Sequence, residues 1–206
     1  MNATQLVEDI PNIRKKLISL FHSNEVCIFG EFLLRCGKRA NLFFNSGKLS
    51  DGESLDVISD LVVAKLVESG IEFDAFIGLP YKAIPLASAV CMKYFKATGR
   101  NIRYGYYRKE KKPYAEDSIF VGHPEVYAEG SRVIILDDIL TAGTAIRASF
   151  DILADTGVKI VAALVILNRE LKFGEFEEFL NGRGVKFIEI LRIDEIVDTT
   201  NVRVGY

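Results

Sequence analysis

Apolar residues recur with helical spacing in two stretches near the start of the chain. Residues 4–23 and 54–69 each place apolar side chains three or four positions apart, which puts them on one face of a helix. Gly70 directly follows the second stretch and predicts its end, because glycine is favoured just after the last turn of a helix. The spacing therefore predicts two amphipathic helices.

Between these helices, two short runs are typical of strands. Residues 26–34 and 40–45 lie on either side of the sequence Cys-Gly-Lys-Arg. A glycine between two strand-like runs is a common hairpin signal. We therefore expect a hairpin with Gly37 at its turn.

From residue 73 onward, strands are expected to alternate with helices. These strands are nearly continuously apolar, which is typical of parallel strands buried on both faces of a sheet. The sequence therefore predicts an α/β fold with a central, mainly parallel sheet flanked by helices. The expected strands cover residues 73–80, 101–108, 131–138, 159–168 and 185–194, and the expected helices cover residues 84–95, 145–157 and 173–184.

Residues 108–130 match neither pattern. The segment is rich in charged residues and contains two prolines, Pro113 and Pro124. A connection of this length without secondary structure is usually functional or mobile. We therefore expect a long loop with a role of its own.

Composition narrows the class of protein. The chain has 206 residues, of which 49% are hydrophobic and 26% charged, as expected for one globular domain with a substantial core. A net charge of −2 argues against a nucleic-acid-binding protein, which usually carries a basic excess. The three cysteines form no C-x-x-C pair, so disulfide and zinc frameworks are not expected.

Localisation is also constrained by the sequence. The first residues lack the apolar run of a secretory signal. The longest apolar run, residues 160–167, is too short to span a bilayer. We therefore expect a cytoplasmic protein without a membrane or nucleic-acid partner.

The stretch VIILDDILTAGTA, residues 133–145, carries the candidate chemistry. Asp137 and Asp138 are expected at the carboxyl end of a strand, where ligands bind in open α/β sheets. Residues 141–144 open the next predicted helix and can direct backbone N–H groups at an anion. A ribose 5-phosphate would suit this combination of anion site and carboxylates. The simpler alternative is a helix cap beside a solvated aspartate.

This stretch resembles the signature with which type I phosphoribosyltransferases bind 5-phosphoribosyl 1-diphosphate (PRPP). P-loop and dinucleotide-binding motifs are absent from the chain. The resemblance implies a single domain over residues 1–206 with the type I phosphoribosyltransferase fold. Its parts would be a small N-terminal hood of about residues 1–50, a PRPP-binding core of about residues 55–206 and a mobile catalytic loop of about residues 107–120.

Four further segments resemble orotate phosphoribosyltransferases within that family. Residues 29–52 contain a Phe-Phe-Asn similar to one that lines the base site in those enzymes. Residues 73–87 contain a Tyr-Lys pair similar to one that faces pyrophosphate. Residues 107–117 resemble the mobile catalytic loop, and the Asn-Arg-Glu at 168–170 resembles the site of an arginine that holds the orotate carboxylate.

The resemblance implies roles for individual residues. The implied catalytic residues are Arg108, Lys109, Lys112, Asp137 and Asp138. The implied PRPP-binding residues are Arg35, Tyr81, Lys82, Arg108, Lys109, Lys112, Tyr114, Asp137, Asp138, Thr141, Ala142, Gly143, Thr144 and Ala145. The implied orotate-binding residues are Phe43, Phe44, Thr141 and Arg169. Asp137 and Asp138 would hold Mg²⁺ indirectly, with the ion mainly on PRPP oxygens and water.

Simpler structural roles compete with these assignments. Two adjacent phenylalanines are often core residues, although alternation along a strand would bury only one of Phe43 and Phe44. Lys82 fits an ordinary surface lysine, and the charged run after Arg108 fits a solvated face. Arg169 fits a partner of the neighbouring Glu170.

The chain also departs from the family pattern. Tyr114 stands where a histidine is common, Arg35 stands where a lysine is common, and residues 115–117 replace a glycine-rich end of the loop. A tyrosine can donate a hydrogen bond but is not a cation near neutral pH. These changes bear on rate and loop movement more than on reaction class.

The implied reaction transfers the 5-phosphoribosyl group of PRPP to N1 of orotate, giving orotidine 5′-monophosphate and pyrophosphate. The resemblance also implies Mg²⁺ as cofactor and a homodimer whose catalytic loop reaches into the neighbouring subunit. Two alternatives remain open. One is another type I phosphoribosyltransferase that acts on a purine base, and the other is a non-catalytic regulator that senses PRPP.

Overall fold

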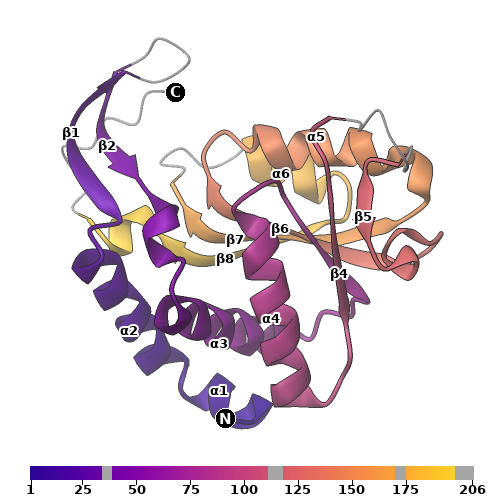
Figure 1. The fold of residues 1–206 in the computed structure, drawn as a ribbon, viewed down its shortest axis with the longest axis horizontal. Coiled ribbons are helices and arrows are strands. Elements are labelled where there is room, and N and C mark those ends of the chain that lie inside the picture. Colours follow the sequence, from indigo (N-terminus) through magenta and orange to yellow (C-terminus); the bar gives the residue numbers. More distant parts are fainter. Residues whose placement is uncertain (34–38, 111–117, 170–174, 198–206) are drawn as a thin grey trace.

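The computed structural model describes residues 1–33, 39–110, 118–169 and 175–197. A six-stranded sheet forms its centre (Figure 1). Neighbouring strands are parallel except for the outermost pair, β4 and β5. The predicted mainly parallel sheet is therefore confirmed. The strand order is β5 (Phe120–Gly122), β4 (Arg103–Tyr107), β3 (Ala75–Gly78), β6 (Arg132–Leu140), β7 (Lys159–Asn168) and β8 (Lys186–Arg192).

Helices cover both faces of this sheet (Figure 1). Helices α3 (Gly52–Ser69) and α4 (Ala83–Thr98) lie on one face, and α5 (Thr144–Leu153) and α6 (Glu175–Asn181) lie on the other. The strands between these layers are apolar because neither face meets water. Residues 133–136 of β6, for example, are fully buried.

Strand β6 extends further than predicted. Asp137 and Asp138 lie inside the strand, because Ile139 and Leu140 continue its pairing with residues 167–168 of β7. The prediction that the two aspartates lie at the carboxyl end of this strand is confirmed, and only the predicted end at residue 138 is two residues too early. Backbone pairing with a long neighbour, rather than the local apolar run, sets where β6 ends.

The N-terminal helix is divided. The expected single helix over residues 4–23 is instead α1 (Ala3–Glu8) and α2 (Ile10–Ser23), with Asp9 between them. Pro11 lies in the first turn of α2. Proline has no N–H for a continuing helical hydrogen bond but is well tolerated where a helix begins. The break therefore follows from one residue within an otherwise regular apolar pattern.

The region expected as a long loop contains structure. Residues 120–122 form β5, which pairs with β4, and a 3-10 turn η2 (Pro124–Tyr127) follows. The Tyr127 hydroxyl donates to the carbonyl oxygen of Tyr106 at 2.7 Å and fixes this turn against β4. The prediction of a loop over all of residues 108–130 is therefore wrong for 120–127, while 111–117 lie outside the described residues.

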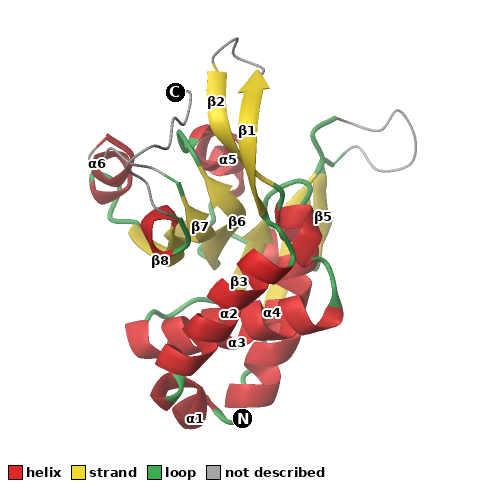
Figure 2. Cartoon of the chain, turned by 90° about the vertical axis from the view of Figure 1, so that its left-hand side faces the viewer, coloured by secondary structure: helices red, strands yellow, loops and turns green. Residues whose placement is uncertain are grey.

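The N-terminal hairpin is confirmed. Strands β1 (Cys27–Leu33) and β2 (Arg39–Phe44) pair antiparallel, and Gly37 lies outside the described residues. Figure 2 shows the hairpin standing out from the body of the protein. The 3-10 turn η1 (Ser46–Leu49) connects it to α3. Within the described ranges, no helix is both long and apolar enough to cross a membrane.

Candidate active site

Three neighbouring parallel strands bring predicted site residues to one edge of the sheet. Strand β3 leads to Tyr81 and Lys82, β6 carries Asp137 and Asp138 near its end, and β7 leads directly to Arg169. Ligands of open α/β sheets bind at the carboxyl ends of the strands. Residues far apart in the sequence therefore share one ligand-binding edge.

Asp137 and Asp138 form a closely coupled carboxyl pair. Burial and the charge of Asp138 raise the pKa of Asp137 to about 7. The backbone N–H of Asp138 donates to Oδ1 of Asp137 at 2.9 Å and partly offsets this shift. Tyr107 at the end of β4 is affected as well, because burial and the charge of Asp137 raise its pKa to about 12. A ligand that donates hydroxyl hydrogens or brings a cation would relieve this concentration of negative charge.

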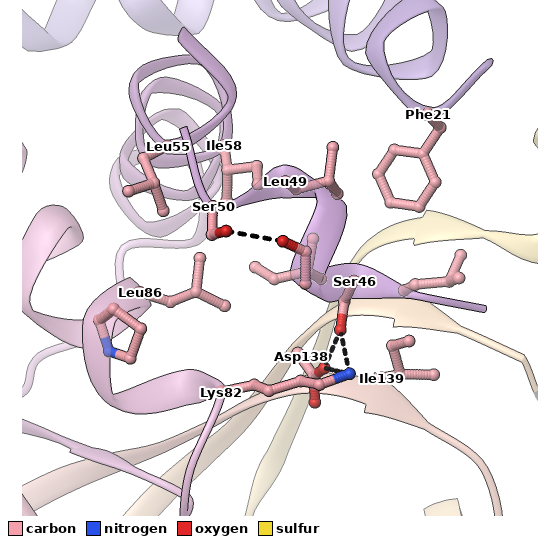
Figure 3. A pocket seen from close by; sticks show the side chains of 14 residues that line it. Phe21, Ser46, Leu49, Ser50, Leu55, Ile58, Lys82, Leu86, Asp138 and Ile139 are labelled. Carbon is pink, nitrogen blue, oxygen red and sulfur yellow. Dashed lines mark hydrogen bonds and ion pairs between the residues drawn. The ribbon is translucent and has the colours of Figure 1, made fainter. Parts of the chain in front are cut away.

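Lys82 and Asp138 are linked through a serine (Figure 3). The Lys82 ammonium donates to the Ser46 hydroxyl at 2.9 Å and lies 3.8 Å from Oδ2 of Asp138. Ser46 donates its own hydrogen to that carboxylate oxygen. The Lys82 side chain is 52% exposed and the Asp138 side chain 17%. The cation therefore lies beside the carboxylate pair and remains accessible to a ligand.

The loop before α5 has the geometry of an anion site. Gly143 is the N-cap of α5 with a φ of +72°, and its carbonyl oxygen accepts from the backbone N–H of Arg147 at 2.9 Å. Thr141, Ala142, Thr144 and Ala145 are exposed. Helix α5 begins at Thr144, one residue earlier than predicted. Free N–H groups at a helix start favour an anion, together with the helix dipole.

Gly143 is also packed closely against Phe176 of α6. A side-chain carbon at this position would lie 2.3 Å from Cδ2 of Phe176 in α6. Glycine is therefore required both by the left-handed backbone and by the space available. The Phe176 ring of α6 therefore packs directly against the backbone of the loop at Gly143.

Arg169 lies against the hairpin strand β2. Its guanidinium carbon is 4.8 Å from the centre of the Phe44 ring, and its backbone N–H donates to the carbonyl oxygen of Leu140 at 3.0 Å. The positive charge of Arg169 also reaches Cys27, where it lowers the pKa that burial raises to about 11. The predicted base-binding arginine and Phe44 are therefore brought together between the hairpin and the end of β7.

The two phenylalanines of β2 differ. Phe44 is 3% exposed, whereas Phe43 is 41% exposed and lies 5.6 Å from the Phe32 ring. The prediction that alternation buries only one of them is confirmed. The ring beside Arg169 is the buried one, so Phe43 does not share that contact with Phe44.

The base of the expected catalytic loop is fixed to the sheet. The backbone N–H of Arg108 donates to the carbonyl oxygen of Ile119 at 2.8 Å, and its guanidinium donates to that of Ser118 at 3.2 Å. The Lys109 ammonium lies 4.9 Å from the centre of the exposed Tyr81 ring. Lys109 is therefore near the pyrophosphate pair expected at 81–82. The predicted site residues Arg35, Lys112 and Tyr114 lie outside the described residues.

Side chains that could bind Mg²⁺ at this site must offer oxygen atoms, because this ion prefers oxygen ligands. Among the described residues, no three His, Cys, Asp or Glu side chains group as a metal centre. Asp137 and Asp138 offer a pair of carboxylates, which are ligands that Mg²⁺ prefers. Such a pair fits an ion held mainly by substrate and water oxygens.

Sequence reasoning missed two residues of this site. Ser46 directly follows the Phe-Phe-Asn segment, and its contacts with Lys82 and Asp138 arise only from the folding of η1 over the sheet. Tyr107 lies close enough to Asp137 for their charges to interact. A serine in a turn and a tyrosine in a strand carry no distinctive sequence signal, so only their positions in space identify them.

Comparisons with known proteins agree with this geometry. The family model for the phosphoribosyl transferase domain matches residues 49–175, which include Lys82, both aspartates and the loop before α5. Orotate phosphoribosyltransferase of Klebsiella pneumoniae is 33% identical over 188 residues, covering 89% of this chain and 86% of that protein. The Schizosaccharomyces pombe enzyme of the same name is 34% identical over 183 residues, covering 86% and 84%. The crystal structure of orotate phosphoribosyltransferase from Aeropyrum pernix aligns with a TM-score of 0.71 and 25% identity, covering 89% and 97%.

Proposed function

This chain belongs to the phosphoribosyl transferase domain family, and we propose that it is an orotate phosphoribosyltransferase of pyrimidine biosynthesis. It transfers the 5-phosphoribosyl group of PRPP to N1 of orotate, giving orotidine 5′-monophosphate and pyrophosphate. The observation that carries this conclusion is the convergence of Lys82, the aspartate pair and Arg169 on one edge of the sheet. Relatives with this name cover most of the chain.

The PRPP half of the reaction uses the central motif. In this proposal, residues 141–145 bind the 5-phosphate through exposed backbone N–H groups and threonine hydroxyls. Asp137 and Asp138 accept hydrogen bonds from the ribose hydroxyls and stabilise positive charge that develops on the ribose as pyrophosphate leaves. Burial and the charge of Asp138 raise the pKa of Asp137, so a ligand that donates hydrogens or brings positive charge to this pair would be favoured.

Several polar and cationic residues are assigned to the leaving pyrophosphate. Lys82 and Tyr81 follow β3, and Lys109 stands beside the Tyr81 ring. Arg108 lies at the base of the loop. We assign these residues to the pyrophosphate, with Arg35, Lys112 and Tyr114 in the same role. Positive charge placed where negative charge develops lowers the barrier to departure, and loop closure would exclude the water that hydrolyses PRPP.

The base half uses Arg169 and the β2 strand. A guanidinium presents two parallel N–H groups that match a carboxylate, and orotate carries one. Phe44 provides an apolar surface beside the guanidinium, and Thr141 is assigned to the same base site. Phe43, exposed on the other face of β2, keeps its assignment to orotate from the family resemblance. Orotate is an anion when it binds, so no general base is assigned. A purine lacks the carboxylate, and Arg169 therefore favours orotate over the purine alternative.

Replacing Arg169 should separate base binding from PRPP binding. Arg169→Ala is expected to raise the KM for orotate roughly 10²-fold, because a charged hydrogen-bonding partner is lost, while PRPP affinity stays unchanged. Arg169→Lys should recover only part of the loss, since lysine lacks the planar fork. Steady-state kinetics with each substrate varied would measure both effects. Arg183→Ala, in the turn after α6 and beside Phe179, is the matched control. An equal loss of PRPP affinity in Arg169→Ala would contradict the assignment.

Mg²⁺ is the proposed cofactor. The carboxylate pair suits an ion that PRPP oxygens and water mainly hold. When bound, the ion would neutralise charge on the diphosphate. Asp137 and Asp138 would hold it indirectly while they orient the ribose.

The first test of function is a direct assay. Purified protein, PRPP and Mg²⁺ would be mixed with orotate, and the loss of orotate absorbance followed, with hypoxanthine, adenine, guanine and uracil in parallel. Among the bases tested, we expect only orotate to be consumed. This activity should disappear when Mg²⁺ is chelated and return when Mg²⁺ is added back. Consumption of another base would retain the PRPP site and overturn the base assignment. Tight PRPP binding without any turnover would favour a PRPP-sensing regulator.

A homodimer with a shared catalytic loop is also proposed. A protomer with Lys112→Ala lacks a loop cation, and one with Asp137→Asn lacks a ribose ligand. If the loop acts across the interface, a mixed dimer contains one intact site and should regain about a quarter to a half of the activity of a wild-type dimer. Activity would be measured before and after subunit exchange. No recovery despite exchange, shown with differently tagged protomers, would contradict the shared site.

A further inference from the structure

Ser46 hydrogen-bonds to a cation and to a carboxylate of the site. Its hydroxyl donates to Oδ2 of Asp138 and accepts from the Lys82 ammonium at 2.9 Å (Figure 3). The ammonium itself is 3.8 Å from that carboxylate oxygen, which is beyond ordinary hydrogen-bond distance. The serine is therefore the hydrogen-bonded link between two charged groups that otherwise interact only through space.

The position of Ser46 in the fold makes this link a long-range one. Ser46 is the first residue of η1 and stands two residues after Phe44 of the hairpin. Lys82 is the N-cap of α4, and Asp138 belongs to β6. One hydroxyl thus joins the segment that carries the proposed base site to two elements of the PRPP core.

The turn η1 borders a cavity on the side of Ser46. A cavity of about 170 Å³ lies under this turn, lined mainly by apolar side chains that include Leu49, Leu55, Ile58 and Leu86, with Ser46, Lys82 and Asp138 on its wall (Figure 3). Close-packed cores restrict a side chain through its neighbours, and an adjoining cavity removes part of that restriction. The hydrogen bonds of Ser46 to Asp138 and Lys82 are therefore expected to contribute to its orientation.

We propose that Ser46 is a positioning residue for PRPP, orienting the Lys82 ammonium and the Asp138 carboxylate. This inference rests on the proposed function of the site. Lys82 has a long flexible side chain that is half exposed, so a fixed acceptor at its end narrows the orientations that it samples. At Asp138, Ser46 and Lys82 both interact with Oδ2. Oδ1 can therefore accept a hydrogen bond from a ligand such as a ribose hydroxyl. Functional groups held in place by a second set of contacts bind with less loss of conformational freedom.

The opposite role predicts the opposite result. If Ser46 instead held Lys82 and Asp138 together against the entry of PRPP, its removal would strengthen PRPP binding. Positioning predicts that removal weakens it. The sign of the change in PRPP affinity therefore decides between the two roles.

The test compares three variants of the full chain by calorimetric PRPP binding and steady-state kinetics. Ser46→Ala should weaken PRPP binding and raise the KM for PRPP about tenfold, as expected for losing hydrogen bonds to charged groups, with a smaller change in kcat. Ser46→Thr keeps the hydroxyl and should restore binding. Ser50→Ala is the control, because the Ser50 hydroxyl donates to the Gly47 carbonyl oxygen of the same turn at 2.6 Å and should leave PRPP binding unchanged.

A double-mutant cycle separates positioning from a general effect on folding. In a Lys82→Met background, Ser46→Ala should weaken PRPP binding less than it does alone, because part of its effect acts through Lys82. PRPP binding that is unchanged or tighter in Ser46→Ala, with normal orotate turnover by the wild type, would overturn this inference alone. A wild type that binds PRPP but does not consume orotate would overturn the proposed function, while the Ser46 dependence of binding would still support positioning.

Discussion

Asp137→Asn should lower kcat by about 10²–10³-fold, the usual cost of losing one well-placed electrostatic group, and should also stabilise the ligand-free protein at alkaline pH. Asparagine retains a carbonyl oxygen that can accept from the backbone N–H of residue 138, as Oδ1 of Asp137 does at 2.9 Å. It removes the negative charge that the proposed mechanism places beside the ribose. The same substitution thus removes function and relieves repulsion.

The stability effect has a defined dependence on pH. Burial and the neighbouring charge of Asp138 raise the pKa of Asp137 from 3.8 to about 7 in the folded protein. Between these two pH values the folded state holds a proton on Asp137 that the unfolded state releases. The ionisation of Asp137 therefore imposes a growing penalty on the unfolding free energy as pH rises. Below about pH 4 the penalty vanishes, because both states are protonated, and above pH 7 it is complete. We expect the variant to gain on the order of 2 kcal/mol in unfolding free energy at pH 8 and little at pH 4.

Urea unfolding from pH 4 to pH 8 would measure this gain, and Asp74→Asn is the control of opposite sign. The Arg132 side chain hydrogen-bonds Asp74 and lowers the pKa of Asp74 to about 2. The ionised Asp74 carboxylate therefore adds to the unfolding free energy at neutral pH, and this contribution is lost as pH falls toward 2. Asp74→Asn should therefore destabilise the protein at pH 8. A stability difference for Asp137→Asn that does not change with pH would refute the assigned carboxyl coupling.

Gly143→Ala should destabilise the protein and abolish tight PRPP binding. The φ of +72° is unfavourable for alanine, and the added carbon would lie 2.3 Å and 2.5 Å from two ring carbons of Phe176. Backbone strain and overpacking each cost roughly 1–3 kcal/mol, so a loss of about 3 kcal/mol in unfolding free energy is expected. Relief of the clash would displace residues 141–144, whose N–H groups are proposed to bind the 5-phosphate.

Gly99→Ala separates the two causes. Gly99 has a similar φ of +73°, but a side-chain carbon there would meet no atom within 4 Å. Its alanine variant should lose only the backbone part, roughly 1–2 kcal/mol, and should retain PRPP binding. Chemical denaturation and calorimetric PRPP titration would compare the pair. Equal losses of stability and normal PRPP binding in both variants would show that Phe176 does not restrict this loop.

Local sequence was enough to predict the parts of the fold that depend on burial and on glycine. Strand β7 covers residues 159–168 as predicted. Its long apolar run is mostly buried between the two helix layers, and such a run is typical of a central parallel strand. Gly70 ends α3 in the left-handed conformation, as its sequence position indicated. The central motif likewise predicted carboxylates followed by a helix start, because these features lie within thirteen consecutive residues.

Other features depend on contacts between distant segments. The edge strand β5 has only three residues and forms by pairing with β4, and the continuation of β6 through the aspartates depends on β7. Alternation indicated that one of Phe43 and Phe44 is buried, but the tertiary structure decided that Phe44 is the ring beside Arg169. Sequence thus determined the family and indicated the candidate anion site, because short motifs encode them. The link from Ser46 to Lys82 and Asp138 was decided only by folding, because it joins three elements through side-chain contacts that no local pattern specifies.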